Sequence, residues 1–118
     1  EFLEFFHRQV GMTPVWMCPL KTTRHWPLYP LAPGRLYVNF GFWGMVPLPP
    51  GRQDGYYNRL IEETVHRLDG HKSLYSTSYY DREEFWRLYN GDAYWPVKRA
   101  YDPEGRLLDL YEKCVRAR

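Results

Sequence analysis

The sequence has little net charge, few cysteines and no long hydrophobic run, and each shortage excludes a class of protein. Its 118 residues include 16 basic and 14 acidic residues, which leave a formal net charge of +2. That balance indicates no general attraction to nucleic acid or to acidic membranes. No stretch has the pattern of a signal peptide or the length of a membrane span. We therefore expect a cytoplasmic chain with no membrane segment.

The two cysteines, Cys18 and Cys114, are far apart and lack the spacing of metal ligands. Each lies in an apolar pattern, so we expect buried free thiols, no metal site and a reducing compartment.

Sequence signatures of independent chemistry are also missing. The chain has no glycine-rich dinucleotide fingerprint, no phosphate loop and no nucleophile beside a base. Asp81, Glu83 and Glu84 form an acidic group, but helix capping explains the first and last of them without catalysis. Arg82 and Glu83 are not needed for the cap and are the better functional candidates, although a surface salt bridge also explains them.

Aromatic residues, in contrast, are abundant. They make up 19% of the chain, with five Trp and eleven Tyr, enough to fill a core and to leave an aromatic face for a partner or ligand. A chain of this length forms one domain, residues 1–118. It begins without Met and already in a helical pattern, so we expect a fragment of a longer protein.

Hydrophobic spacing predicts a helix at residues 1–10 and strands at 13–20 and 35–45, joined by a proline-rich loop. We expect the apolar residues of that loop either to cover a core or to contact a missing neighbour. The expected apolar sets are Phe2, Leu3, Phe6 and Val10 in the helix, Trp26, Leu28, Tyr29 and Leu31 in the loop, and Leu36, Val38, Phe40 and Phe42 on the core face of the second strand. The other face of that strand carries Tyr37, Asn39, Gly41 and Trp43, where the glycine would let a ligand or another backbone segment approach closely.

Residues 56–68 have the period of an amphipathic helix that ends at Asp69-Gly70. Its wet side would carry Glu62, Glu63, His66 and Arg67, so we interpret His66 as a surface residue. Residues 73–80 are rich in Tyr, Ser and Thr and predict a third strand, which runs into a helix capped by Asp81 and ended by Asn90-Gly91.

The last part predicts a short helix at residues 92–101 and a final helix with Asp102 as N-cap and Pro103 at its first position. We expect its apolar face to hold Leu107, Leu108, Tyr111, Cys114 and Val115, with Arg116 and Arg118 late in the helix. The element order predicts an α+β fold, an antiparallel sheet with helices packed on one face, broadly ferredoxin-like.

Three segments carry a family resemblance. Residues 79–86 read Tyr-Tyr-Asp-Arg-Glu-Glu-Phe-Trp and resemble a signature of the Δ24-sterol reductases, the diminuto and seladin group, and their bacterial relatives. These are FAD-linked oxidoreductases of the vanillyl-alcohol-oxidase type. Residues 14–20, Pro-Val-Trp-Met-Cys-Pro-Leu, and 36–44, Leu-Tyr-Val-Asn-Phe-Gly-Phe-Trp-Gly, resemble two strands of the same group, in the same order.

The resemblance implies a C-terminal cap, or substrate, domain whose sheet lies over the flavin of a separate N-terminal FAD-binding domain. Hydride would move between flavin and a small-molecule substrate in the space between them. The implied substrate-facing and flavin-facing residues are Tyr37, Asn39, Trp43, Tyr75, Ser78, Tyr80 and Arg82. The fragment alone would be inactive, and no catalytic residue is assigned.

The substrate and the class of function both stay open. Asn39 stands where the sterol reductases have an acidic residue, so a polyprenyl, other lipid or sugar-derived substrate is an alternative to a sterol. A different class of function is a stand-alone ferredoxin-like binding module that recognises a partner through its aromatic loops.

Overall fold

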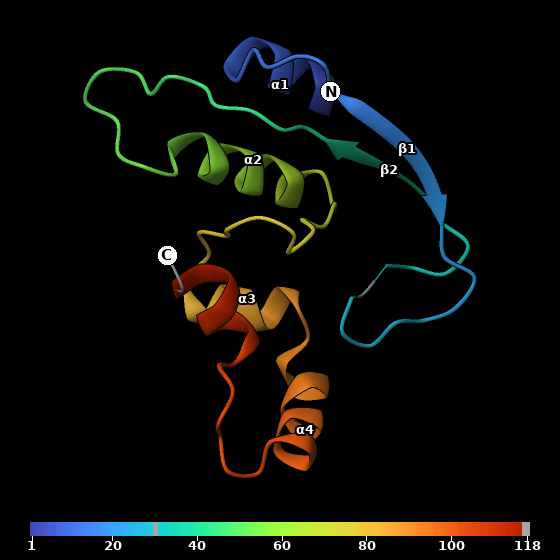
Figure 1. Cartoon of the computed structure of the whole chain (residues 1–118). Helices are drawn as coiled ribbons and strands as arrows, with labels where there is room; N and C mark the ends of the chain where they lie inside the picture. The colour runs from blue at the N-terminus through green and yellow to red at the C-terminus, as the bar shows by residue number, and fades with distance from the viewer. Residues whose placement is uncertain (30, 117–118) are drawn as a thin grey trace.

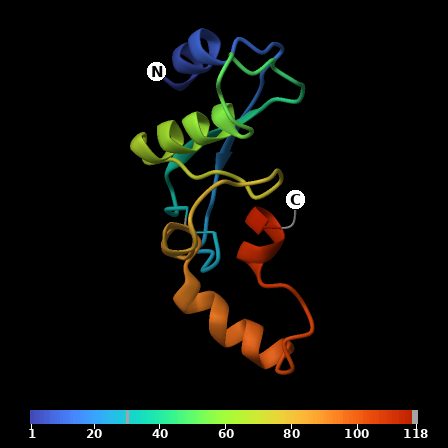
Figure 2. The ribbon, with the colours of Figure 1, turned by 90° about the vertical axis from the view of Figure 1, so that its left-hand side faces the viewer.

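The computed structural model describes residues 1–29 and 31–116 of the chain. Within them lie a two-stranded antiparallel sheet and several short helices, so the predicted α+β class is confirmed. The upper half of the molecule in Figures 1 and 2 holds the sheet, α1 and α2, and the lower half holds α3, α4 and η1. The elements are α1 (Phe2–Gln9), β1 (Trp16–Lys21), β2 (Leu36–Gly41), α2 (Tyr56–Arg67), α3 (Arg82–Leu88), α4 (Gly91–Tyr101) and the π-helical turn η1 (Glu112–Arg116).

The sheet pairs Trp16 with Gly41 at one end and Lys21 with Leu36 at the other. Only one end of its predicted core face is covered. The rings of Phe40 and Phe42 lie 4.8 and 4.4 Å from those of Phe2 and Phe6 in α1. Leu36 and Val38 were expected beside them, but they are 65% and 47% exposed. That part of the prediction is wrong because α1 has eight residues, about 12 Å of helix, and is too short to cover the whole strand.

A first core forms where α1 packs on α2. Phe6, Val10 and Ile61 are its buried residues. Leu3 was expected on this face but is exposed, and Phe5 packs against the cluster instead. The helical period was therefore read correctly, while the apolar stripe is rotated slightly from the predicted one.

A second core lies between α3 and the C-terminal turn. Tyr80, Phe85, Tyr89 and Val115 are buried there, and Tyr29 from the proline-rich loop packs against them. Tyr29 thus covers a core, whereas Trp26 and Leu28 of the same loop are exposed. The reading that the loop covers a core is therefore confirmed for Tyr29, and contact of Trp26 and Leu28 with a missing neighbour stays a prediction.

The predicted third strand at residues 73–80 does not form. The segment has irregular backbone and crosses between α2 and α3 (Figure 1). The N–H of Ser78 donates to the carbonyl oxygen of Cys114, and the N–H of Tyr79 donates to the carboxylate of Glu62. Buried backbone groups need partners, and here a turn and a side chain supply them in place of a neighbouring strand.

The predicted final helix does not begin at Asp102 either. The carboxylate of Asp102 accepts from the backbone N–H groups of Arg106 and Leu107 and pairs with Lys98. It closes a loop after α4, and regular helical structure resumes only at residue 110. Leu107 and Leu108 are consequently exposed, contrary to expectation, while Val115 is buried and Cys114 half-buried as a free thiol. Arg118 lies outside the described residues.

Candidate functional site

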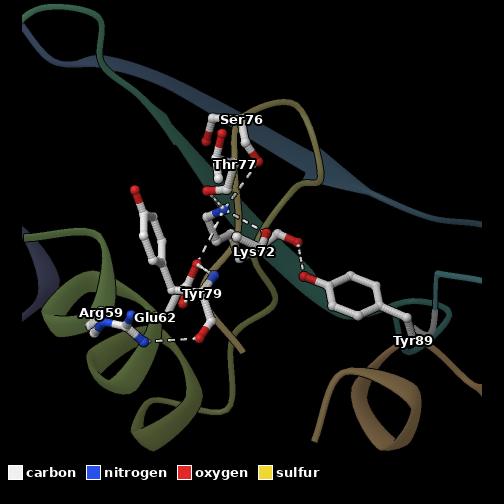
Figure 3. Close-up of polar contacts among 8 residues, drawn as sticks. Arg59, Glu62, Lys72, Ser76, Thr77, Tyr79 and Tyr89 are labelled. Atoms are coloured by element: carbon white, nitrogen blue, oxygen red, sulfur yellow. Dashed lines mark hydrogen bonds and ion pairs between the residues drawn. The ribbon is translucent and has the colours of Figure 1, made fainter. Parts of the chain in front are cut away.

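A polar network joins the two halves of the molecule (Figure 3). Its centre is the ammonium group of Lys72, which lies just after α2. Lys72 Nζ donates to Ser78 Oγ at 2.8 Å, to the carbonyl oxygen of Thr77 at 3.0 Å and to that of Ser76 at 3.4 Å. It also lies 3.4 Å from the carboxylate of Glu62. One cation therefore fixes three consecutive residues of the irregular segment.

Glu62, from the middle of α2, holds the same segment from the other side. Its two carboxylate oxygens each lie 3.1 Å from the N–H of Tyr79, and Arg59 donates to the carbonyl oxygen of Tyr79 at 3.1 Å. Glu62 is 3% exposed, so its predicted place on the wet side of the helix is wrong. The segment docks on that side of α2 and converts a polar position of the helix into a buried one.

Burial determines the electrostatics of this pair. It raises the pKa of Glu62 and lowers the pKa of Lys72, and the opposite charge of each partner counteracts both shifts. An ammonium group has three N–H donors, and four acceptors of this chain surround that of Lys72. No donor is left for a substrate, so the network acts by positioning residues 76–80.

Gly55 lies at the edge of this network, next to Tyr79. Its φ of +78° is left-handed, and a Cβ there would lie 2.1 Å from the ring of Tyr79. The N-terminus of α2 and the irregular segment can approach each other this closely only with glycine at position 55.

The structure separates the predicted site residues into four places. Ser78 and Tyr80 are buried, Ser78 completely, and belong to the packing around the network and the second core. Burial raises the pKa of Tyr80 above its ordinary value. Tyr75 is 85% exposed on the turn before them. These side chains therefore do not share one cavity wall.

Arg82 pairs with Asp109 at 2.7 Å, and its guanidinium lies over the ring of Tyr111. Its side chain is half exposed while that of Asp109 is buried. Arg82 thus tethers the start of α3 to the loop before η1.

The remaining candidates belong to the second strand. Asn39 and Trp43 are exposed on β2 and just beyond it, while the hydroxyl of Tyr37 accepts from the N–H of Ala32 at 3.0 Å. A Cβ at Gly41 would lie 2.9 Å from the ring of Trp43 and 3.0 Å from that of Trp16. The glycine accommodates two indole rings of this chain, and these rings occupy the space predicted for a ligand.

A small polar cavity of about 240 Å³ adjoins Tyr37, with His66, Asp69, His71 and Arg87 in its lining. His66 is exposed, as expected. The ring of His71 lies 4.6 Å from those of Tyr29 and Tyr89, and its Nε2 has no hydrogen-bond partner among the described residues. Burial lowers the pKa of His71, which favours the neutral imidazole.

This lowered pKa predicts a loss of stability in acid. Because the unfolded chain takes up the proton at about pH 6.5 and the folded chain only at lower pH, the free energy of unfolding falls as the pH drops below about 6.5, by at most about 1.4 kcal/mol per pH unit. Glu62, with its raised pKa, acts in the opposite direction. To isolate the contribution of His71, urea unfolding of wild type and of His71→Gln is measured at about pH 7.5 and about pH 5.5. The free energy of unfolding should fall more between these two pH values in wild type than in His71→Gln. His66→Gln is the control, and equal pH slopes for wild type and His71→Gln would contradict the assignment.

At the junction before α3, the predicted cap forms although the predicted strand does not. Asp81 caps α3, since its carboxylate accepts from the N–H of Glu84 at 2.8 Å. Asp81→Ala should lower the free energy of unfolding by about 1 kcal/mol, measured by urea denaturation. Glu83→Ala is the matched control, because that carboxylate lies in the same turn but makes no capping bond. Equal losses in the two variants would exclude the cap as the cause.

No group of His, Cys, Asp and Glu able to hold a metal ion occurs within residues 1–29 and 31–116. In the same residues, no helix combines the length and apolar character needed to cross a bilayer.

No protein-family model and no solved structure matches the chain. Among curated proteins it is similar to Delta(24)-sterol reductases. It is 26% identical to the Rattus norvegicus protein over 126 residues, and this alignment covers 99% of this chain and 23% of the relative. The Homo sapiens protein is 25% identical with the same coverage, and the Arabidopsis thaliana protein is 25% identical over 137 residues, covering 100% of this chain and 24% of the relative. The resemblance predicted from the sequence is thus confirmed, and the chain spans about a quarter of the length of these relatives.

Proposed function

We propose that this chain is the substrate-side domain of an FAD-dependent oxidoreductase that reduces a sterol or a similar lipid. The observation that carries the proposal is the similarity of nearly the whole chain to Delta(24)-sterol reductases. Because the chain spans only about a quarter of their length, the rest of such an enzyme, including an N-terminal FAD-binding domain, would come from additional polypeptide.

The exposed residues of this chain suit contact with one face of the flavin ring, but not with the phosphates of FAD. Trp16 and Trp43 are exposed at one end of the sheet, and Asn39 is exposed in the middle of β2. Two indole surfaces and an amide match a flat ring with polar edges. When bound, FAD would supply the hydride chemistry. The role of these three side chains would be to orient the ring and the substrate and to limit the access of water.

The expected result with the isolated chain is weak FAD binding at most. Phosphates are usually held by backbone N–H groups of a glycine-rich turn at a helix N-terminus, and the sequence has no such fingerprint. Titration with FAD, followed by flavin fluorescence, should therefore show no sub-micromolar binding. Sub-micromolar binding would contradict the proposed division between the two domains.

The activity itself is tested on the full-length polypeptide that carries this chain. It should purify yellow, and its reduced flavin should be reoxidised by a sterol with a Δ24 double bond. Asn39→Ala should lower the rate of that reoxidation without changing the melting temperature, because Asn39 is exposed. A colourless protein, or a flavin that does not react with any sterol or polyprenyl compound, would refute the proposal.

A stand-alone binding module is the second candidate. Trp26 and Leu28 favour it, because these apolar side chains are exposed on a loop. Determining the sequence upstream of this chain would distinguish the oxidoreductase domain from the binding module. A preceding segment of about 200 residues, the size of a further domain, with glycine-rich flavin-binding turns supports the oxidoreductase, and a stop or an unrelated domain supports the module.

A further inference from the structure

The small net charge of the chain conceals a strong asymmetry. Residues 5–53 contain no Asp or Glu, and they carry the five cations Arg8, Lys21, Arg24, Arg35 and Arg52. Residues 54–118 contain the other 11 basic residues and 12 acidic ones. The first segment forms α1, the sheet and the loops around it, along the top of Figure 1, down its right-hand side and, after β2, at its upper left. Acids outside the segment pair with two of these cations, Arg8 with Glu4 and Arg35 with Asp69. Lys21, Arg24 and Arg52 are the cations of the segment for which the described residues provide no ion pair.

An open groove of about 1030 Å³ lies where the loop after β1, in this segment, faces the helix α4. Most of its lining is apolar, two threonines add hydroxyl groups, and its charged residues are cations. The lining residues are Leu20, Lys21, Thr22, Thr23, Arg24, Trp26, Pro27, Leu28, Tyr29, Leu31, Ala93 and Val97.

The apolar side chains of the groove are exposed, some on the loop and others on α4. Trp26 and Val97 are each nearly half exposed. The loop is closed by the N–H of Gly34, which donates to the carbonyl oxygen of Thr22, and Asn90 Nδ2 donates to the carbonyl oxygen of Pro27 at 2.7 Å. Apolar surface kept in water by such bonds is typical of an interaction site.

Lys21 and Arg24 are available for an external anion. Neither has an ion-pair partner in the part of the chain that the structure describes. Arg24 lies 4.1 Å from the ring of Trp26, so its charge is held beside the exposed indole. Arg35 nearby is paired with Asp69, so we do not include it among the cations available for an external anion. Asp92 is the acidic residue adjacent in sequence to the groove, next to Ala93.

We propose that this groove docks on an anionic lipid surface. Trp26 and Leu28 would enter the interface between headgroups and acyl chains, where tryptophan is favoured. Lys21 and Arg24 would contact lipid phosphates, since cations beside inserted apolar residues bind anionic leaflets. An acidic protein surface would match the two cations but not the apolar lining. The proposal does not depend on the enzymatic one.

The test uses the full-length polypeptide with vesicles of phosphatidylcholine, with and without phosphatidylglycerol, and with brominated lipid to quench inserted tryptophan. We expect binding that requires phosphatidylglycerol and weakens with salt, and quenching that Trp26→Phe removes. Arg24→Ala and Lys21→Ala should each reduce the partition coefficient about fivefold, since each cation near such a surface contributes about 1 kcal/mol. Both side chains are exposed, so melting temperatures should not change.

Arg67→Ala is the matched control, because Arg67 is an exposed cation of α2 away from the groove. It should bind vesicles as wild type does. Three results would overturn the proposal: no binding to either vesicle, equal binding with and without phosphatidylglycerol, or binding and quenching that the Trp26, Arg24 and Lys21 variants leave unchanged. If another part of the polypeptide also binds lipid, the Trp26, Arg24 and Lys21 variants still report the contribution of the groove.

Discussion

Replacing Lys72 with methionine should lower the free energy of unfolding by about 3–5 kcal/mol, the usual effect of removing one partner of a buried ion pair. The substitution leaves the 3%-exposed Glu62 without its counter-ion. It also leaves Ser78 Oγ and the carbonyl oxygens of Ser76 and Thr77 without the donor they share. Urea denaturation at neutral pH measures the loss.

Two further variants identify the cause. Glu62→Gln keeps an acceptor for the N–H of Tyr79, so it should be less destabilising than Lys72→Met. The double variant should lose less than the sum of the two single losses, because the residues interact directly. Lys113→Met removes an exposed lysine and should change stability by no more than about 0.5 kcal/mol. Additive losses would show that Lys72 and Glu62 do not stabilise each other, and a similar loss at Lys113 would show that the effect is not specific to the buried pair.

Truncation of Phe85 to alanine should also be severe, about 3–5 kcal/mol, through lost burial and the cavity left behind. Phe85 is 0% exposed, and its ring lies 4.7 Å from that of Tyr89 and 5.4 Å from that of Tyr111. It therefore connects α3 to the C-terminal part of the chain. Thermal and urea unfolding would both report the loss.

Leu107→Ala is an informative control for Phe85→Ala. The sequence pattern predicts Leu107 in the core of a final helix, whereas the structure leaves it 69% exposed. The structure therefore predicts a change within about 0.5 kcal/mol. A loss of 2 kcal/mol or more, as for a buried leucine, would favour the predicted helix over the loop at residues 102–109.

The helices that the sequence predicted well are those with a local signal. The carboxylate of Asp81 accepts a hydrogen bond from the N–H of Glu84, as aspartates at helix N-termini commonly do. Asn90 adopts the left-handed φ of +53° that is expected at a helix end. Helix caps of both kinds involve residues only a few positions apart in the sequence. They depend little on the rest of the fold, and so they can be read from the sequence.

Elements that depend on distant partners were predicted less well. Residues 73–80 have strand-forming side chains, but strand formation needs a neighbouring strand with free N–H and C=O groups. The structure offers this segment the carboxylate of Glu62 and the ammonium of Lys72 instead. Likewise, Asp102 followed by proline suits a helix start, yet Lys98 and the loop at 106–107 compete for its carboxylate.

The sequence by itself determined the helical period of α1 and α2, the capped start of α3, the antiparallel α+β class and the resemblance to Δ24-sterol reductases, because each rests on spacing along the chain. Only the tertiary structure decided that Glu62 is buried, that Ser78 and Tyr80 are packed inside, and that Trp26 and Arg24 share an open groove. The physical reason is that burial and charge pairing depend on which distant segment lies opposite a side chain. No pattern within one segment carries that information.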